Sequence, residues 1–444
     1  MESSGAPLRC LVTGATGYIG GRLVPRLLDA GFEVRALART PDKLNDVPWR
    51  TRIEVARGDL GDPASLESAF ADVDIVYYLV HSMGFEKDFA AEERRAAQNV
   101  AAAARRAGVR RIVYLSGLHP EGAELSTHLG SRTAVGEILI ASGIETVVLQ
   151  AGVVVGSGSA SFEMIRHLTD RLPVMTTPKW VHNKIQPIAI RDVLYYLVAA
   201  ATCPVPESRA WDVGGPDVLE YGGMMQVYAD VAGLLPRRIL VLPVLTPRIA
   251  ALWVGLVTPI PAGLARPLVE SLHCDAVMAN HDIDTIIPPP EGGLTPYRQS
   301  VELALARVSR GEAETTWHTG TAAQLPSDPE WAGEVVFTDT RTSHTPVSPE
   351  RLWQALEAGV PAGWQISERE PGRVLKLRDT HRSPGDRWLE MRVAPEGSGS
   401  RYEQRAFFYP RGLLGRVYWY AARPWQAAAL GRQVRRVTSA VKGG

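Results

Sequence analysis

The sequence predicts an α/β protein in which a doubly wound, Rossmann-type parallel sheet precedes a smaller α+β domain. Short apolar strands alternate with helical segments through the first 150 residues, which is the pattern of a parallel sheet covered by helices. A glycine-rich turn joins the first strand to the first helix. Beyond residue 313, one strand and one helix are followed by several strands and a closing helix, which indicates an antiparallel sheet.

The first element is an apolar run at 9–13, and 18–30 is the helix that follows it. The turn between them has the spacing G-x-x-G-x-x-G, and it directs backbone N–H groups and a helix N-terminus toward a pyrophosphate. Gly14 allows the tight turn, Gly17 allows close approach of the phosphates, and Gly20 allows the helix to pack on the strand. The sequence therefore predicts a dinucleotide site. Its expected contacts from this turn are Gly14, Thr16, Gly17, Tyr18, Ile19 and Gly20.

The second strand, 33–39, ends in Arg39. NAD-specific proteins often carry an acid at this strand end, which bonds the ribose 2′-hydroxyl, whereas an arginine suits a 2′-phosphate. Arg39, helped by Arg35, therefore favours NADP, with NAD as the alternative. The remaining strands are expected at 74–80, 111–115 and 145–150, and a helix is expected at 88–106.

Four motifs together resemble the atypical, NmrA-like short-chain dehydrogenase/reductases over about residues 8–290. They are Gly14 to Gly20, Gly58-Asp59-Leu60, Leu115-Ser116-Gly117 and Gln150 to Gly156. The resemblance implies that Asp59 lies beside the adenine, and Leu60 next to it is a further expected contact of the cofactor. It also implies that Val80, His81 and Ser116 line the nicotinamide side, and His119 is a further candidate to face the cleft.

The helix after the Ser116 strand departs from the family's Tyr-x-x-x-Lys. His128 stands where the tyrosine would be, and Arg132 stands where the lysine would be. An arginine can hold a ribose but does not tune a neighbour as lysine does, and a histidine that titrates near neutrality can act as the acid. The candidate catalytic residues are thus His128, Arg132 and Ser116.

Two functions follow from this departure. The first is an NADP-dependent oxidoreductase that reduces an apolar carbonyl, enone or quinone-like small molecule. The second is a non-catalytic dinucleotide-binding redox sensor or assembly protein of the NmrA type. The sequence leaves the choice open and leans toward the enzyme.

The predicted domains are 1–290, 291–313 and 314–444. The first comprises a dinucleotide-binding core at about 8–156 and a substrate and lid part at about 157–287, in which Asp192 is expected to cap a helix at 193–201. The apolar stretch 240–266, which has no charged residue between Arg248 and Arg266, is expected to form a lid over an apolar pocket or a surface for a membrane or protein partner. Residues 291–313 form a linker and connecting helix.

Residues 314–444 resemble the helix-grip domain of the polyketide-cyclase and START-like group, whose curved antiparallel sheet wraps a long final helix. The segments 408–415 and 418–420 also match an uncharacterised domain that follows atypical reductases in bacteria. After Glu403 the chain has eight Arg or Lys residues and no acid. Arginines on a final helix more often serve only to solvate it, and a membrane or nucleic-acid surface is the alternative.

Composition narrows the function classes further. Lys plus Arg and Asp plus Glu both number 48, so net charge gives no support for nucleic-acid binding. Cys10, Cys203 and Cys274 are widely spaced in apolar surroundings, which argues against disulfides and a zinc site. No signal-type segment opens the chain, and no metal motif is present, so we expect a cytoplasmic protein without a metal.

Overall fold

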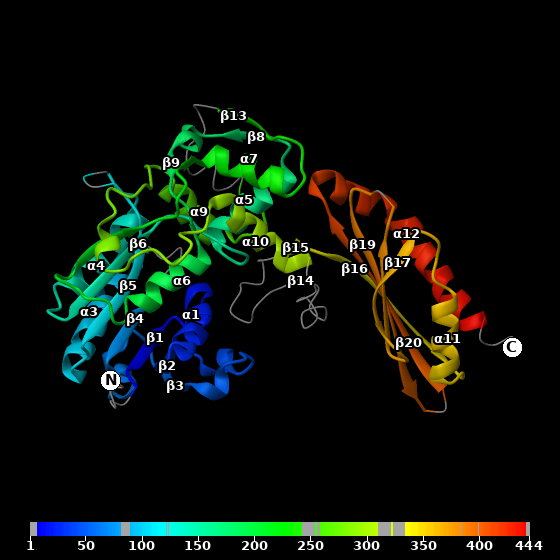
Figure 1. The fold of residues 1–444 in the computed structure, drawn as a ribbon, viewed down its shortest axis with the longest axis horizontal. Coiled ribbons are helices and arrows are strands. Elements are labelled where there is room, and N and C mark those ends of the chain that lie inside the picture. Colours follow the sequence, from blue (N-terminus) through cyan, green and yellow to red (C-terminus); the bar gives the residue numbers. More distant parts are fainter. Residues whose placement is uncertain are drawn as a thin grey trace. The chain divides into compact units, whose positions relative to one another are not determined.

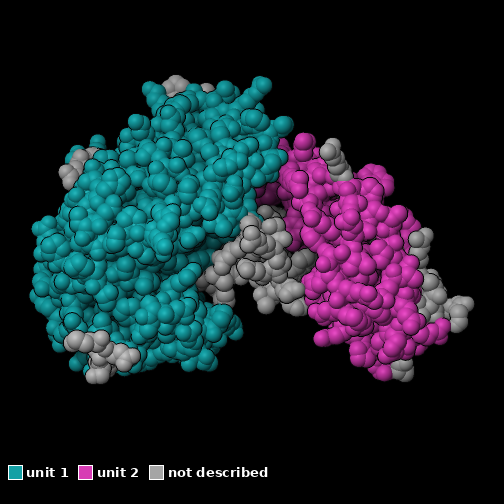
Figure 2. Space-filling view, in the orientation of Figure 1, with its two compact units in different colours: residues 1–169, 174–309, 324–332 teal, residues 170–173, 310–323, 333–444 magenta. Residues whose placement is uncertain are grey.

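The computed structural model describes residues 7–80, 89–120, 122, 124–241, 254, 258–309, 321–322, 334–381, 383–397 and 399–440. These fall into two compact units (Figure 2). Unit 1 comprises the described residues within 1–169 and 174–309, and unit 2 comprises those within 170–173, 321–322 and 334–444.

Unit 1 is built on a seven-stranded sheet in the order β11-β6-β5-β4-β1-β2-β3, and every neighbouring pair is parallel (Figure 1). Its strands are β1 (Arg9–Thr13), β2 (Glu33–Ala38), β3 (Glu54–Arg57), β4 (Ile75–Tyr78), β5 (Arg111–Gly117), β6 (Glu145–Ala151) and β11 (Arg209–Val213). The strand order reverses between β1 and β4, where ligands of such sheets bind. The predicted doubly wound parallel sheet is confirmed.

Helices cover both faces of this sheet. On one face α1 (Tyr18–Asp29) and α6 (Ile190–Ala199) bury Leu23, Leu27 and Leu197 against the strands. On the other face α3 (Phe89–Ala107) and α4 (Thr127–Ile140) bury Val100 and Leu139. The two hydrophobic clusters hold the carboxyl ends of the strands, and hence the loops that follow them, in fixed positions.

The rest of unit 1 consists of short strand pairs and helices. The pairs are β7 (Val154–Val155) with β10 (Ile188–Ala189), β9 (Lys184–Ile185) with β12 (Leu219–Glu220), and β8 (Val174–Thr177) with β13 (Arg238–Val241). The helices are α2 (Glu67–Phe70), α5 (Ala160–Arg171), α7 (Tyr221–Val231), α9 (Ala262–Ser271) and α10 (Tyr297–Ser309). Helix α10 lies in unit 1, where Tyr297 Oη donates to the Met224 carbonyl at 3.1 Å.

The predicted cap at Asp192 is wrong. Helix α6 begins at Ile190, its N-cap position is Ala189, and Asp192 lies inside the first turn. The buried Asp192 carboxylate instead accepts hydrogen bonds from the Thr295 N–H at 2.7 Å and the Thr295 hydroxyl at 3.2 Å. The two donors of Thr295 thus take the place of the helix N–H groups that a capping carboxylate would bind. These two hydrogen bonds connect α6 to the segment before α10.

Unit 2 contains a five-stranded antiparallel sheet in the order β16-β20-β19-β18-β17. The strands are β16 (Phe337–Thr345), β17 (Trp364–Glu370), β18 (Val374–Asp379), β19 (Gly385–Glu396) and β20 (Gly399–Pro410); β14 (Thr321–Ala322) and β15 (Glu334–Val335) form a separate pair. Helix α11 (Pro349–Ala358) has Ser348 as its N-cap, whose hydroxyl accepts a hydrogen bond from the Arg351 N–H. The sequence pattern predicts the closing helix at about 425–441. Helix α12 instead spans Gly412–Ala440, and thus begins well before Trp425.

Leu352 and Leu356 of α11 and Val434 of α12 pack with Leu377 and Met391 of the sheet. Both helices therefore contribute to one core on one face of the sheet. Among the described residues, no helix is both long and apolar enough to cross a bilayer. Most of the predicted lid or contact stretch 240–266, namely 242–253 and 255–257, lies outside the described residues.

Candidate active site

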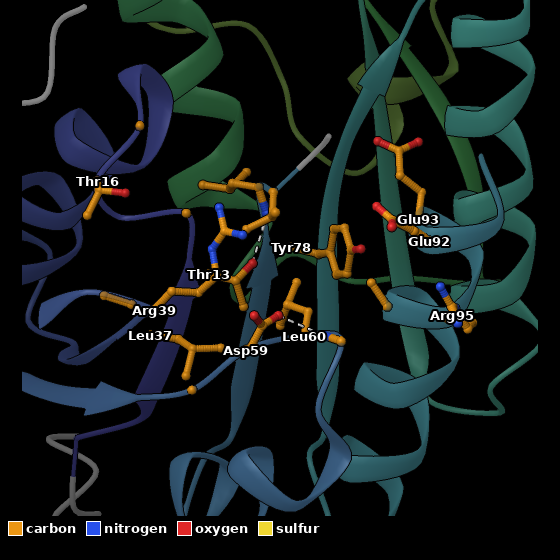
Figure 3. A pocket seen from close by; sticks show the side chains of 18 of the residues that line it. Thr13, Thr16, Leu37, Arg39, Asp59, Leu60, Tyr78, Glu92, Glu93 and Arg95 are labelled. Atoms are coloured by element: carbon orange, nitrogen blue, oxygen red, sulfur yellow. Dashed lines mark hydrogen bonds between the residues drawn. The ribbon is translucent and has the colours of Figure 1, made fainter. Parts of the chain in front are cut away.

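A cleft of about 1100 Å³ opens at the carboxyl ends of the central strands of unit 1 (Figure 3). The glycine loop after β1, the ends of β2 and β4, the loop after β3 and the first turns of α3 form its walls. The lining residues are Thr13, Gly14, Thr16, Gly17, Leu37, Ala38, Arg39, Gly58, Asp59, Leu60, Gly61, Tyr78, Leu79, Val80, Phe89, Glu92, Glu93, Arg95 and Ala96.

The glycine loop has the geometry that a diphosphate requires. Gly14 has φ +77°, and a Cβ built on it would lie 3.0 Å from the Leu79 carbonyl oxygen. A Cβ on Gly20 would lie only 2.3 Å from the Gly14 carbonyl oxygen, so α1 can approach the loop only with glycine there. Gly17 is the N-cap of α1, and no side chain caps this end of the helix. The N–H groups of the first turn can thus face an anion in the cleft.

Arg39 and Asp59 lie at the end of the cleft formed by β2 and β3 (Figure 3). Arg39 is exposed, whereas one Asp59 carboxylate oxygen already accepts from the Gly61 N–H at 2.9 Å. The expected help from Arg35 is wrong. That side chain is buried, donates to the carbonyls of Ala69 and Ala71, and pairs with a glutamate of β3 at 2.8 Å.

Helix α3 forms one wall of the cleft, and none of its residues is among the site residues predicted from the sequence. Glu93 lines the cleft although it is only 4% exposed, and its carboxylate accepts a hydrogen bond from the Ser131 hydroxyl of α4. A signal was available, because Glu93, Ala97 and Val100 have the i, i+4, i+7 spacing of an inward helix face. An acid at the start of such an apolar face indicates a residue that faces a site.

Arg132 links α4 to the end of β5. Its Nη2 donates to the Leu115 carbonyl at 2.6 Å, and its own carbonyl accepts from the Tyr114 hydroxyl at 3.2 Å. Its Nε is buried and has no hydrogen-bond partner in the described part of the chain. Ser116 is buried on the same strand, two residues beyond Tyr114. Arg132 therefore fixes α4 against the end of β5 and has one N–H still to be satisfied.

His128 lies in the first turn of α4 and is 8% exposed. Burial, and then the positive charge of Arg132, lower the pKa of His128 to about 4. The expectation that His128 titrates near neutrality is therefore wrong, because the cost of burying a second positive charge beside Arg132 was not visible in the sequence. At neutral pH the ring is uncharged and can donate a hydrogen bond, but it is not a protonated acid.

This shift predicts a pH dependence of stability. Between pH 6.5 and pH 4 the unfolded chain binds a proton at His128 that the folded chain does not, so stability falls as the pH falls through this window. From pH 7 to pH 5 the loss is expected to be about 2 kcal/mol. Urea unfolding of the full chain at pH 7 and pH 5 should show this fall in the free energy of unfolding. In a His128→Gln variant the fall should be smaller by about 2 kcal/mol. A variant that keeps the whole loss would contradict the assignment.

His119 lies two residues beyond β5, at the same edge of the sheet. Its Nδ1 is 3.3 Å from the Pro120 carbonyl oxygen. Its Nε2 is 3.0 Å from the Thr133 hydroxyl and 3.3 Å from the Gln150 amide nitrogen. The structure thus brings together polar side chains from the loop after β5, from α4 and from β6. This cluster lies just past the end of β5, the strand that carries Ser116.

The predicted site residues divide into groups. Those that line the cleft are Gly14, Thr16, Gly17, Arg39, Asp59, Leu60 and Val80. Tyr18, Ile19 and Gly20 form the start of α1 behind the loop, and His81 lies outside the described residues. Ser116, His128 and Arg132 gather around β5 and α4 without lining the cleft. The described ranges contain no cluster of side chains suited to a metal ion.

Fold and cleft together define a Rossmann-type nucleotide-binding protein. Residues 14–153 match the family described as NAD(P)H-binding, and residues 358–428 match a family described as a protein of unknown function. A Streptomyces griseus (4-alkanoyl-5-oxo-2,5-dihydrofuran-3-yl)methyl phosphate reductase is 35% identical over 216 residues, which are 47% of this chain and 68% of that protein. The Caulobacter vibrioides ceramide reductase is 27% identical, over 66% of this chain and 92% of that protein.

Among solved structures, the Citrobacter sp. triphenylmethane reductase complexed with NADP(H) has a similar fold. It shares 21% identity, matches 67% of this chain and 100% of its own, and gives a TM-score of 0.53. The chain belongs to the NAD(P)-binding, NmrA-like reductases of the short-chain dehydrogenase/reductase family.

Proposed function

We propose that this protein is an NADP(H)-dependent reductase of an apolar carbonyl, enone or quinone-like small molecule. The observation that carries the proposal is that Arg39 lines the same cleft as the glycine loop. An exposed guanidinium at the end of β2 is the group that binds a 2′-phosphate. The residue that follows β2 is Arg39 and not the acid that would bond the 2′-hydroxyl of NAD, which supports NADP over NAD.

The remaining contacts follow from the strand order. A dinucleotide whose adenosine lies at β2 and β3 extends across β1 and β4, so its nicotinamide end lies toward β5. We assign the buried Nε–H of Arg132 to a hydrogen bond with a ribose hydroxyl of the bound dinucleotide. Ser116 lies nearby on β5, whose Leu115 carbonyl accepts from the same arginine. When bound, NADPH supplies a hydride for the electrophilic carbon of the substrate, and one proton must reach the substrate's oxygen.

His128 and His119 are the groups that we assign to the substrate oxygen. The neutral His128 ring donates a hydrogen bond that polarises a carbonyl, as a histidine with a lowered pKa does without giving up its proton. His119, whose Nε2 lies within hydrogen-bond distance of Thr133 and Gln150, is the second ring at this edge. We assign it to the relay of a proton taken up from solvent to the substrate oxygen.

Two relatives support the substrate class. One is named for an alkanoyl-bearing dihydrofuranone phosphate and the other for a ceramide, and both substrates carry acyl chains. We therefore infer a substrate with an apolar chain beside the reducible group. The stretch 240–266 remains our proposal for a lid over that chain or for a contact with a membrane or protein.

A deuterium-transfer assay tests the reductase directly. The full chain is incubated without oxygen with NADPH deuterated at C4 and, separately, with a long-chain ketone, an alkyl enone and a naphthoquinone. We expect a reduced ketone or enone that carries one deuterium, measured by mass spectrometry, and NADPH oxidation with the quinone. Tight NADPH binding without reduction of any of the three would instead support a non-catalytic dinucleotide-binding protein, which the missing Tyr-x-x-x-Lys favours.

We also propose that unit 2 is a helix-grip domain that takes a small apolar ligand. In support, its first strand β16 pairs with its last strand β20, and α11 and α12 share one core with the sheet. A co-purified small molecule, released by denaturation and identified by mass spectrometry, would test this assignment.

A further inference from the structure

Helix α12 carries a solvent-facing stripe along most of its length. The stripe positions are separated by three or four residues, as one face of a helix requires, and all are exposed. They are Leu414, Val417, Ala421, Trp425, Ala428, Arg432 and Arg435. Leu414 and Trp425 are each 73% exposed, and Tyr420 beside them is 64% exposed. The stripe is thus apolar in its first half and basic in its second.

The opposite side of α12 is the side that packs on the sheet. Trp419 stacks on Phe337 at 5.2 Å and on Phe408 at 5.5 Å between ring centroids. Val434 is buried in the core of unit 2, and a Cβ on Gly415 would lie 2.3 Å from the Pro384 carbonyl oxygen. The helix is therefore anchored through its inner side, and the exposed apolar residues do not serve the fold of this unit.

The charge of α12 is one-sided. Between Gly412 and Ala440 the helix has five arginines and no acidic residue, although the whole chain has a net charge of zero. Arg423, Arg432 and Arg435 are exposed. An exposed helix face whose aromatic and aliphatic side chains are followed by arginines suits the surface of an anionic bilayer. The acyl boundary takes the apolar side chains, and the headgroup phosphates take the arginines.

We propose that the exposed stripe of α12 binds the surface of a bilayer that contains anionic lipids. Leu414, Val417 and Trp425 would enter the boundary between headgroups and acyl chains, and Arg432 and Arg435 would reach lipid phosphates. A second copy of the chain fits less well. Parallel stripes would set arginine against arginine, and antiparallel stripes would set Arg435 against Leu414 and Arg432 against Val417.

Vesicle sedimentation of the full chain tests this proposal. We expect binding to vesicles of equimolar phosphatidylglycerol and phosphatidylcholine, weaker binding at high salt, and little binding to phosphatidylcholine alone. The double variant Arg432→Glu, Arg435→Glu should lower the partition coefficient by at least about tenfold. Trp425→Ala should lower it by about tenfold through loss of the buried ring.

Two variants in the same unit are matched controls. Ile366→Ala removes an apolar side chain that is 51% exposed on β17, and Arg401→Glu reverses an exposed charge on β20; both should bind vesicles as the wild type does. Circular dichroism checks that each variant is folded. Equal binding to neutral and anionic vesicles, or no binding to either, would overturn the proposal. So would a mass in solution that falls from dimer to monomer with Trp425→Ala, which would identify a second copy as the occupant.

Discussion

Replacing Gly20 with valine is expected to weaken NADPH binding by about 100-fold or more, which is about 3 kcal/mol of binding free energy. The first side-chain atom would lie 2.3 Å from the Gly14 carbonyl oxygen and 2.9 Å from the Ala15 Cα. Both neighbours are backbone, so α1 or the glycine loop must move, and the loop N–H groups lose their alignment with the phosphates. We also expect a loss of about 1–3 kcal/mol of stability from overpacking. Isothermal titration and urea unfolding measure the two effects.

Gly223→Ala is the matched control for that substitution. Gly223 lies inside helix α7, and a Cβ there would meet no atom within 4 Å. This variant should bind NADPH like the wild type and be more stable by about 0.5–1 kcal/mol, because alanine loses less backbone entropy in a helix. An unchanged NADPH affinity in Gly20→Val would refute the role assigned to the glycine loop.

Arg39→Glu is expected to weaken NADPH binding by about 100-fold while NADH binding changes by less than about threefold. The substitution removes a charged hydrogen-bond donor to the 2′-phosphate and puts a like charge in its place. NADH has no phosphate at that position, so the two affinities should separate. Titration of each dinucleotide into wild type and variant measures the change.

Arg57→Glu is the matched control for Arg39→Glu. It tests whether NADPH affinity depends on the contact of Arg39 with the 2′-phosphate or only on the positive charge around the cleft. Arg57 is exposed at the end of the neighbouring strand β3 but does not line the cleft. Its charge reversal should alter NADPH affinity by less than about threefold, because screened charges beyond contact distance interact weakly. Equal losses for NADPH and NADH in Arg39→Glu would contradict the 2′-phosphate assignment.

Local patterns predicted the parallel sheet and the glycine loop because their signals lie within a few consecutive residues. Gly14 needs a positive φ and Gly20 needs a close contact, and both requirements select glycine at fixed spacing. The sequence also predicts that the strand at 401–409 pairs with the strand at 387–393 across the short turn 395–400, and the β19–β20 pairing confirms this hairpin.

Errors arose where a distant partner decides what a side chain does. Arg35 and Asp192 have plausible local roles, but each is buried against groups far away in sequence. The pKa of His128 depends on burial and on Arg132, and both follow from packing. The early start of α12 depends on the stacking of Trp419 between two rings of the sheet, whereas Gly415 and Pro424 weaken its local helix signal.

Titration of the wild-type chain with NADPH and with NADH is the measurement that tests the central claim most directly. The cleft described here, with its glycine loop and Arg39, predicts that both dinucleotides bind and that NADPH binds at least about tenfold more tightly. Equal affinities, tighter binding of NADH, or binding of neither would contradict it.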